Sequence, residues 1–118
     1  MSWIGVDLDG TLAEYSSWHE GQIGQPIPAM LARVKGWLAG GQEVRIFTAR
    51  VCRMNEEERQ AQIKLIEAWC KKHIGIVLPI TNEKDWSMVE LWDDRCVRVI
   101  TNTGRRCCAE MGTNEGME

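Results

Sequence analysis

Residues 3–12 read Trp-Ile-Gly-Val-Asp-Leu-Asp-Gly-Thr-Leu, an apolar run that ends in two aspartates one residue apart, followed by Gly-Thr. Aspartate is disfavoured in strands and is seldom buried without a partner. Asp7 and Asp9 point to the same side of an extended chain, and Gly10 permits a tight turn after them. A strand that merely ends in an Asp-capped turn is the simpler interpretation. Two carboxylates leaving one strand instead suggest a bound cation, and ligation by oxygen alone suits Mg²⁺.

Strand-like and helix-like patterns alternate along the rest of the chain. Apolar residues recur at helical spacing between Ile27 and Leu38, before Gly40-Gly41, and again between Ile63 and Ile74, after a capping signal at Asn55. Short apolar or alternating runs lie at residues 43–47, 76–80, 88–92 and 96–100. This order predicts an α/β fold, a Rossmann-like three-layer sandwich with a mainly parallel sheet of about five strands. Links between the later strands are too short for full helices, so one face of the sheet should be thinly covered.

Polar side chains follow three of the predicted strands. Asp7 and Asp9 end the first strand, Thr48 ends the strand at 43–47, and Asp93-Asp94 follows the run at 88–92. Ligands of open α/β sheets bind beyond the carboxyl ends of the strands. The three strand ends therefore predict one shared site.

The string apolar-Asp7-x-Asp9-Gly-Thr-Leu resembles the first motif of the haloacid dehalogenase (HAD) superfamily. The resemblance implies that Asp7 attacks phosphorus to form an aspartyl-phosphate and that Asp9 is the general acid and base. Mg²⁺ would let the anionic nucleophile approach an anionic phosphate. Members that cleave carbon–halogen bonds lack the second acid, so Asp9 favours phosphoryl transfer. On this basis Gly10 and Thr11 are expected among the phosphate-binding residues.

Three further segments resemble the remaining HAD motifs in order, so the resemblance spans about residues 3–101. Phe47-Thr48-Ala49-Arg50 resembles the second motif, in which the hydroxyl and backbone N–H groups hold phosphate; Arg50 is either a further grip on phosphate or a surface charge. Lys84 fits the third motif by order and would neutralise charge at the nucleophile. Leu91-Trp92-Asp93-Asp94 resembles the fourth. The family's magnesium would be held by Asp7, the Asp9 backbone carbonyl and Asp93, with Asp94 bound directly or through water.

No segment is long enough for the large cap that many HAD proteins carry. Residues 13–27 leave room for a short flap, in which Trp18 could stack on a base or sugar. We therefore expect a capless catalytic core over residues 1–103 and a polar, mobile tail over 104–118. The predicted activity is that of a Mg²⁺-dependent phosphatase with an open site, acting on a small phosphorylated molecule or a nucleic-acid phosphate end. The alternatives are a HAD-fold module that binds Mg²⁺ and phosphate without turnover, and a generic α/β domain.

Composition restricts the partners. The chain has 118 residues and a formal net charge of −3, which argues weakly against a broad nucleic-acid-binding face. No apolar run reaches the 18 or so residues that a membrane span needs. Five cysteines without paired spacing predict reduced thiols and a cytoplasmic protein, with Cys52 either near the site or an incidental loop residue. An open site on a short sheet also leaves room for a homo-oligomer, in which a partner subunit supplies a lid.

Overall fold

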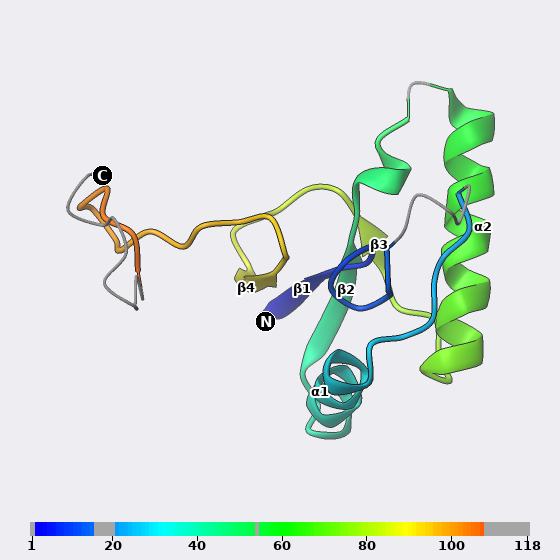
Figure 1. Cartoon of the computed structure of the whole chain (residues 1–118), viewed down its shortest axis with the longest axis horizontal. Helices are drawn as coiled ribbons and strands as arrows, with labels where there is room; N and C mark the ends of the chain where they lie inside the picture. The colour runs from blue at the N-terminus through cyan, green and yellow to red at the C-terminus, as the bar shows by residue number, and fades with distance from the viewer. Residues whose placement is uncertain (1, 16–20, 54, 108–118) are drawn as a thin grey trace.

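The computed structural model describes residues 2–15, 21–53 and 55–107. Within them a four-stranded parallel sheet, in the order β3-β2-β1-β4, packs against two helices (Figure 1). The elements are β1 (Trp3–Asp7), α1 (Pro28–Ala39), β2 (Glu43–Phe47), the 3-10 turn η2 (Ala49–Val51), α2 (Glu56–His73), β3 (Ile80–Thr81) and β4 (Met88–Trp92). The α/β class and the parallel sheet are confirmed. The sheet has four strands rather than five.

The strand expected at residues 96–100 does not join the sheet. Figure 1 shows the chain after β4 running away from the sheet. In this stretch Val97 and Val99 are 60% and 51% exposed, and Val99 forms an isolated antiparallel bridge with Arg106. The alternating pattern at residues 96–100 therefore marks a segment that pairs at Val99, but it pairs with the nearby Arg106 and not with an edge of the sheet. The run at 76–80 is likewise mostly outside the sheet, because Ile76 and Val77 are exposed and pairing begins at Ile80.

Both helices cover the same face of the sheet. Ile4 and Val6 pair in register with Val44 and Ile46, so the four side chains share one face. They form a single buried cluster with residues of α1 (Met30, Val34) and α2 (Ile66, Trp69, Cys70). The described residues place no helix on the opposite face, so the fold has two layers and the three-layer expectation was wrong. The strands β1, β2 and β3 follow one another in one direction across the sheet. Right-handed crossovers between such parallel strands all lie on the same face of the sheet.

The opposite face has the thin cover that short links predict. Trp3 is fully buried there: the guanidinium of Arg45 stacks 4.3 Å from its ring centroid, and its indole N–H donates to Asp85 Oδ1 at 2.8 Å. Asp85 belongs to the loop between β3 and β4. Arg45 of β2 and Asp85 of this loop thus cover Trp3 on the back of β1, the strand that ends at Asp7.

Helix ends follow the sequence signals. Asn55 Oδ1 accepts hydrogen bonds from the backbone N–H groups of Glu57 and Glu58, which starts α2. Helix α1 begins at Pro28 and ends before Gly40, and Gly41 has a φ of +87° that favours glycine. No described helix is long and apolar enough to cross a membrane.

Candidate active site

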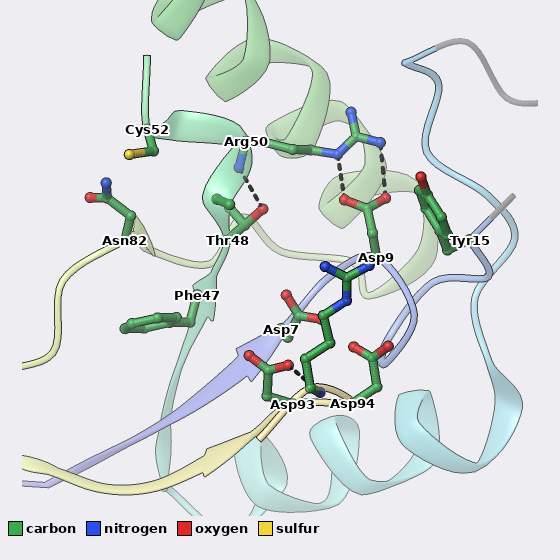
Figure 2. A pocket seen from close by; sticks show the side chains of 12 residues that line it. Asp7, Asp9, Tyr15, Phe47, Thr48, Arg50, Cys52, Asn82, Asp93 and Asp94 are labelled. Carbon is green, nitrogen blue, oxygen red and sulfur yellow. Dashed lines mark hydrogen bonds and ion pairs between the residues drawn. The ribbon is translucent and has the colours of Figure 1, made fainter. Parts of the chain in front are cut away.

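A cavity of about 460 Å³ lies at the carboxyl ends of β1, β2 and β4 (Figure 2). The strand ends that the sequence singled out meet there, as the parallel topology requires. Its lining is acidic on one side and includes two hydroxyls, an amide, a thiol and two guanidinium groups on the others. The lining residues are Asp7, Asp9, Tyr15, Phe47, Thr48, Ala49, Arg50, Cys52, Asn82, Asp93, Asp94 and Arg95.

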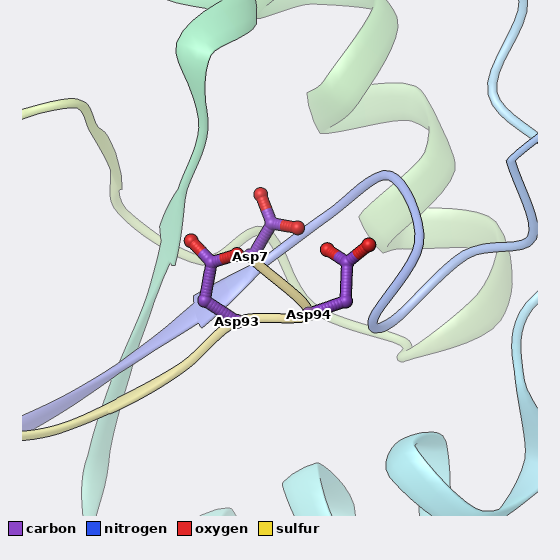
Figure 3. Close-up of side chains that lie close together, drawn as sticks. All are labelled: Asp7, Asp93 and Asp94. Carbon is purple, nitrogen blue, oxygen red and sulfur yellow. The ribbon is translucent and has the colours of Figure 1, made fainter. Parts of the chain in front are cut away.

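Three carboxylates converge at the floor of this cavity. One oxygen each from Asp7, Asp93 and Asp94 lies within 4.8 Å of the others (Figure 3). Octahedral Mg²⁺ with bonds of about 2.1 Å holds its ligand oxygens about 3.0 to 4.2 Å apart. Small side-chain rotations would bring the three oxygens into that range. A donor set made only of carboxylates suits a hard cation such as Mg²⁺, so the residues fit the ion that the sequence predicts.

The loop after β1 is shaped around this cluster. Gly10 has a φ of +93°, and a Cβ at this position would lie 2.6 Å from Asp94 Oδ2. The Thr11 hydroxyl accepts from the Asp94 backbone N–H at 3.0 Å and lies 3.2 Å from Asp7 Oδ2 and 3.3 Å from Asp94 Oδ1, to one of which it donates. Gly10 and Thr11, which we expected to bind phosphate, do not line the cavity. They position two of the carboxylates instead.

The surroundings of Asp7 disfavour its ionised form. Burial, the charge of Asp93 and a hydrogen bond with Asp94 raise the pKa of Asp7 to about 7, and the bond from Thr11 offsets this only in part. A divalent cation among the three carboxylates would reverse the effect by favouring the ionised form. The electrostatics of Asp7 therefore agree with the geometry of the cluster.

Asp9 and Arg50 form a bidentate ion pair across the mouth of the cavity (Figure 2). Arg50 Nε lies 2.6 Å from Asp9 Oδ2, and Arg50 Nη2 lies 2.9 Å from Asp9 Oδ1. The same guanidinium also donates to the backbone carbonyls of Gly21 and Gln22 and to Gln62 Oε1 of α2. Its five N–H donors are thus all engaged. Arg50 is neither a surface charge nor, in this arrangement, free to hold phosphate.

The pair also changes the interpretation of Asp9. The three-residue cluster that could hold a metal does not include the Asp9 side chain, which faces Arg50. The sequence placed Asp9 among the metal ligands. With its side chain paired to Arg50, Asp9 can still contribute its backbone carbonyl to the metal site.

Thr48 and Ala49, directly after β2, both line the cavity. Thr48 is 98% buried at the end of β2, and its Oγ1 accepts from the Arg50 backbone N–H at 3.1 Å. A hydroxyl that accepts can still donate its own hydrogen, so Thr48 can offer an O–H to an anion in the cavity. Its backbone N–H bonds to the Thr81 carbonyl of β3, which fixes the strand end.

Lys84 is the expected site residue that the structure does not bring to the cavity. It is exposed in the loop between β3 and β4, whereas Asn82, directly after β3, lines the cavity. No helix follows β3 to turn a lysine inward. Asn82 was missed, although the rule that polar residues at strand ends form the site would have found it. Arg95 and Tyr15 complete the rim, and Trp18 lies outside the described residues.

Comparisons with known proteins support the fold alone. No family model matches the chain, and no curated protein matches it. Its structure is similar to that of a conserved protein from Bacteroides thetaiotaomicron, with a TM-score of 0.54, 22% sequence identity, and coverage of 80% of this chain and 77% of that one. A likeness at this identity concerns architecture and leaves the chemistry to be argued from the site.

Proposed function

We propose that this chain is a Mg²⁺-dependent phosphohydrolase that works through an aspartyl-phosphate on Asp7. The observation that carries the proposal is the convergence of Asp7, Asp93 and Asp94 within 4.8 Å at the floor of a cavity that Thr48 also lines. Nucleophile, metal ligands and phosphate-binding hydroxyl come from three different strand ends. The order and identity of these residues along the chain are those of the HAD motifs that the sequence resembles.

Each side chain has a step in this scheme. Mg²⁺ would supply the positive charge that lets Asp7 approach the phosphoryl group. Asp7 Oδ forms a bond to phosphorus while the bond to the leaving oxygen breaks, the departing oxygen takes a proton from solvent water, and Thr48 donates to a phosphoryl oxygen. Water then attacks the phosphorus of the aspartyl-phosphate, the bond to Asp7 breaks, and Asp9 accepts the proton from that water. Arg95 replaces Lys84 as the cation beside the phosphoryl group, because it lines the cavity and Lys84 does not.

Arg50 acts on this scheme through Asp9. By pairing with both of its oxygens, Arg50 fixes the position of Asp9, the group that accepts the proton in the second step. The hydrogen bonds from Arg50 to Gly21 and Gln22 tie the loop before α1 to the same group. We regard Arg50 as a positioning residue.

A module that binds Mg²⁺ and phosphate without turnover is the second candidate. The observation in its favour is the same ion pair, since an Asp9 fully engaged by Arg50 cannot give a proton to a leaving group. The two functions differ in hydrolysis and agree in binding.

The deciding experiment is phosphate release with and without Mg²⁺ from a panel of an aryl phosphate, nucleotides, sugar phosphates and end-phosphorylated oligonucleotides. The wild type should release phosphate only with Mg²⁺, and Asp7→Asn should release none. The Lys84→Gln variant is the matched control and should behave as the wild type. Release that persists in Asp7→Asn would overturn the proposal, and Mg²⁺-dependent phosphate binding with no release would favour the binding module.

A further inference from the structure

The segment that leaves the active site, residues 95–107, is a strongly cationic arm. It carries Arg95, Arg98, Arg105 and Arg106 and no acidic residue, which gives it a formal charge of +4. The rest of the chain has ten basic and 17 acidic residues, for a formal charge of −7. The overall charge of −3 thus hides a segregation of charge that the composition alone could not reveal.

Within the arm the backbone forms a hydrogen-bonded hairpin. Ile100 N–H donates to the Arg105 carbonyl at 2.8 Å, and Cys107 N–H donates to the Arg98 carbonyl at 2.7 Å. Asn102 and Gly104, with φ values of +64° and +73°, make the turn between the two sides. The tail boundary that the sequence suggested at residue 104 therefore falls inside this hairpin, and residues 108–118 lie outside the described residues.

The arm presents its charge to solvent beside the site. All four arginine residues are exposed, and none of Arg95, Arg98 and Arg105 takes part in a salt bridge within the described parts of the chain. Arg95 lines the cavity and directly follows Asp93 and Asp94. From there the arm runs outward (Figure 1), and its first five residue steps span roughly 17 Å at strand spacing.

We propose that this arm binds the phosphodiester backbone of a single-stranded nucleic acid whose terminal phosphate enters the cavity. This inference rests on the proposed function, since it names the substrate class of the same site. A polymer with one phosphate per unit matches a cavity for a phosphate end that is followed by an arm with three further exposed arginine residues. Arginine suits such contacts because its fork of N–H donors fits phosphate oxygens. Tyr15, 66% exposed at the rim of the cavity, offers a ring on which the terminal base stacks.

An anionic membrane is the competing partner for a cationic segment. Segments that bind membrane interfaces usually present Trp, Phe or Leu to the lipid. The arm contains none of these, and its apolar residues are Val97, Val99 and Ile100 besides two cysteines. The composition therefore favours phosphate contacts without an apolar anchor.

The test measures binding and catalysis separately. The double variant Arg98→Gln/Arg105→Gln removes two charges outside the cavity, and Lys71→Gln/Lys72→Gln on α2 removes two exposed charges elsewhere as a matched control. Each pair is combined with Asp7→Asn, and the full-length chain is titrated with a fluorescent single-stranded 12-mer that bears a terminal phosphate. The arm variant should bind about three- to tenfold more weakly at low salt. Its slope of log affinity against log salt should be shallower by about 1.4, or 0.7 for each phosphate that no longer meets an arginine, while the control keeps the parent slope.

Catalysis is measured on variants that retain Asp7. Hydrolysis of a small aryl phosphate should be the same in the arm variant and the wild type, because Arg98 and Arg105 are not among the residues that line the cavity. Equal oligonucleotide affinity and slope in the arm variant and its control would overturn the arm proposal and leave the proposed function standing. No hydrolysis of any substrate, with arm-dependent binding intact, would instead count against the proposed function. Binding of vesicles rich in anionic lipid that depends on the arm, without oligonucleotide binding, would also overturn the arm proposal in favour of a membrane.

Discussion

Replacing Gly10 by alanine should uncouple Asp94 from the metal site without unfolding the protein. Two effects act at this position. The φ of +93° costs a residue with a Cβ about 1–2 kcal/mol, and the new Cβ would lie 2.6 Å from Asp94 Oδ2. An ordinary contact begins at 3.4 Å, so the carboxylate must retreat by about 0.8 Å. That exceeds the roughly 0.2 Å within which metal–ligand distances hold.

Gly41→Ala is the matched control, because Gly41 has a φ of +87° and a Cβ there meets nothing within 4 Å. Both variants should lose about 1–2 kcal/mol of stability, or roughly 4 °C of melting temperature per kcal/mol. They should differ in the response to Mg²⁺. At a concentration one hundred times its dissociation constant, Mg²⁺ should stabilise the wild type and Gly41→Ala by about 2.7 kcal/mol.

For Gly10→Ala, a tenfold weaker affinity would reduce that stabilisation to about 1.4 kcal/mol. The assay is thermal unfolding with and without Mg²⁺, followed by a direct titration of the ion. An equal Mg²⁺ response in Gly10→Ala and Gly41→Ala would refute the assignment of Asp94 to the metal site. A reduced response in both would show that backbone strain, and not the contact with Asp94, is responsible.

Three further predictions concern charge, capping and proton transfer. Because the pKa of Asp7 is raised from 3.8 to about 7, the metal-free native protein keeps a proton that the unfolded chain releases. Its free energy of unfolding should therefore fall as the pH rises from about 4 to about 7. Urea titrations at several pH values would measure this fall, and Mg²⁺ should remove it. Asn55→Ala removes the acceptor for two backbone N–H groups of α2 and should cost about 1 kcal/mol in the same assay, whereas Asn55→Asp should cost little. Because Asp9 serves the second step alone in this scheme, Asp9→Asn should slow hydrolysis of aryl and alkyl phosphates by similar factors in steady-state kinetics. A much larger loss of rate with alkyl phosphates would show instead that Asp9 protonates the leaving group.

The sequence located the centre of the site because parallel strands bring their carboxyl ends to one edge. Asp7, Thr48 and Asp93 could be placed together because each follows a predicted strand of a parallel sheet, without any distance. The number of strands was harder to predict. An alternating run such as 96–100 indicates extended backbone, but pairing depends on whether a partner edge is within reach, and that is a property of the whole chain.

The partners of individual side chains could not be predicted. Asp9 is two residues from Asp7, yet one carboxylate lies in the acidic cluster and the other faces Arg50 of η2. Whether Lys84 or Asn82 reaches the cavity depends on the length and path of the loop that follows β3. Such contacts form between segments far apart in the sequence, so the local sequence pattern does not predict them.

The central claim is that Asp7 is a nucleophile activated beside Mg²⁺, and a test of it need not know the substrate. Beryllofluoride forms a tetrahedral adduct with a carboxylate that imitates the aspartyl-phosphate, and fluorine NMR detects the bound form directly. We expect a bound signal with wild-type protein and Mg²⁺, loss of that signal on chelation or in Asp7→Asn, and retention in Lys84→Gln. A signal that persists in Asp7→Asn, or no Mg²⁺-dependent signal in the wild type, would contradict the account.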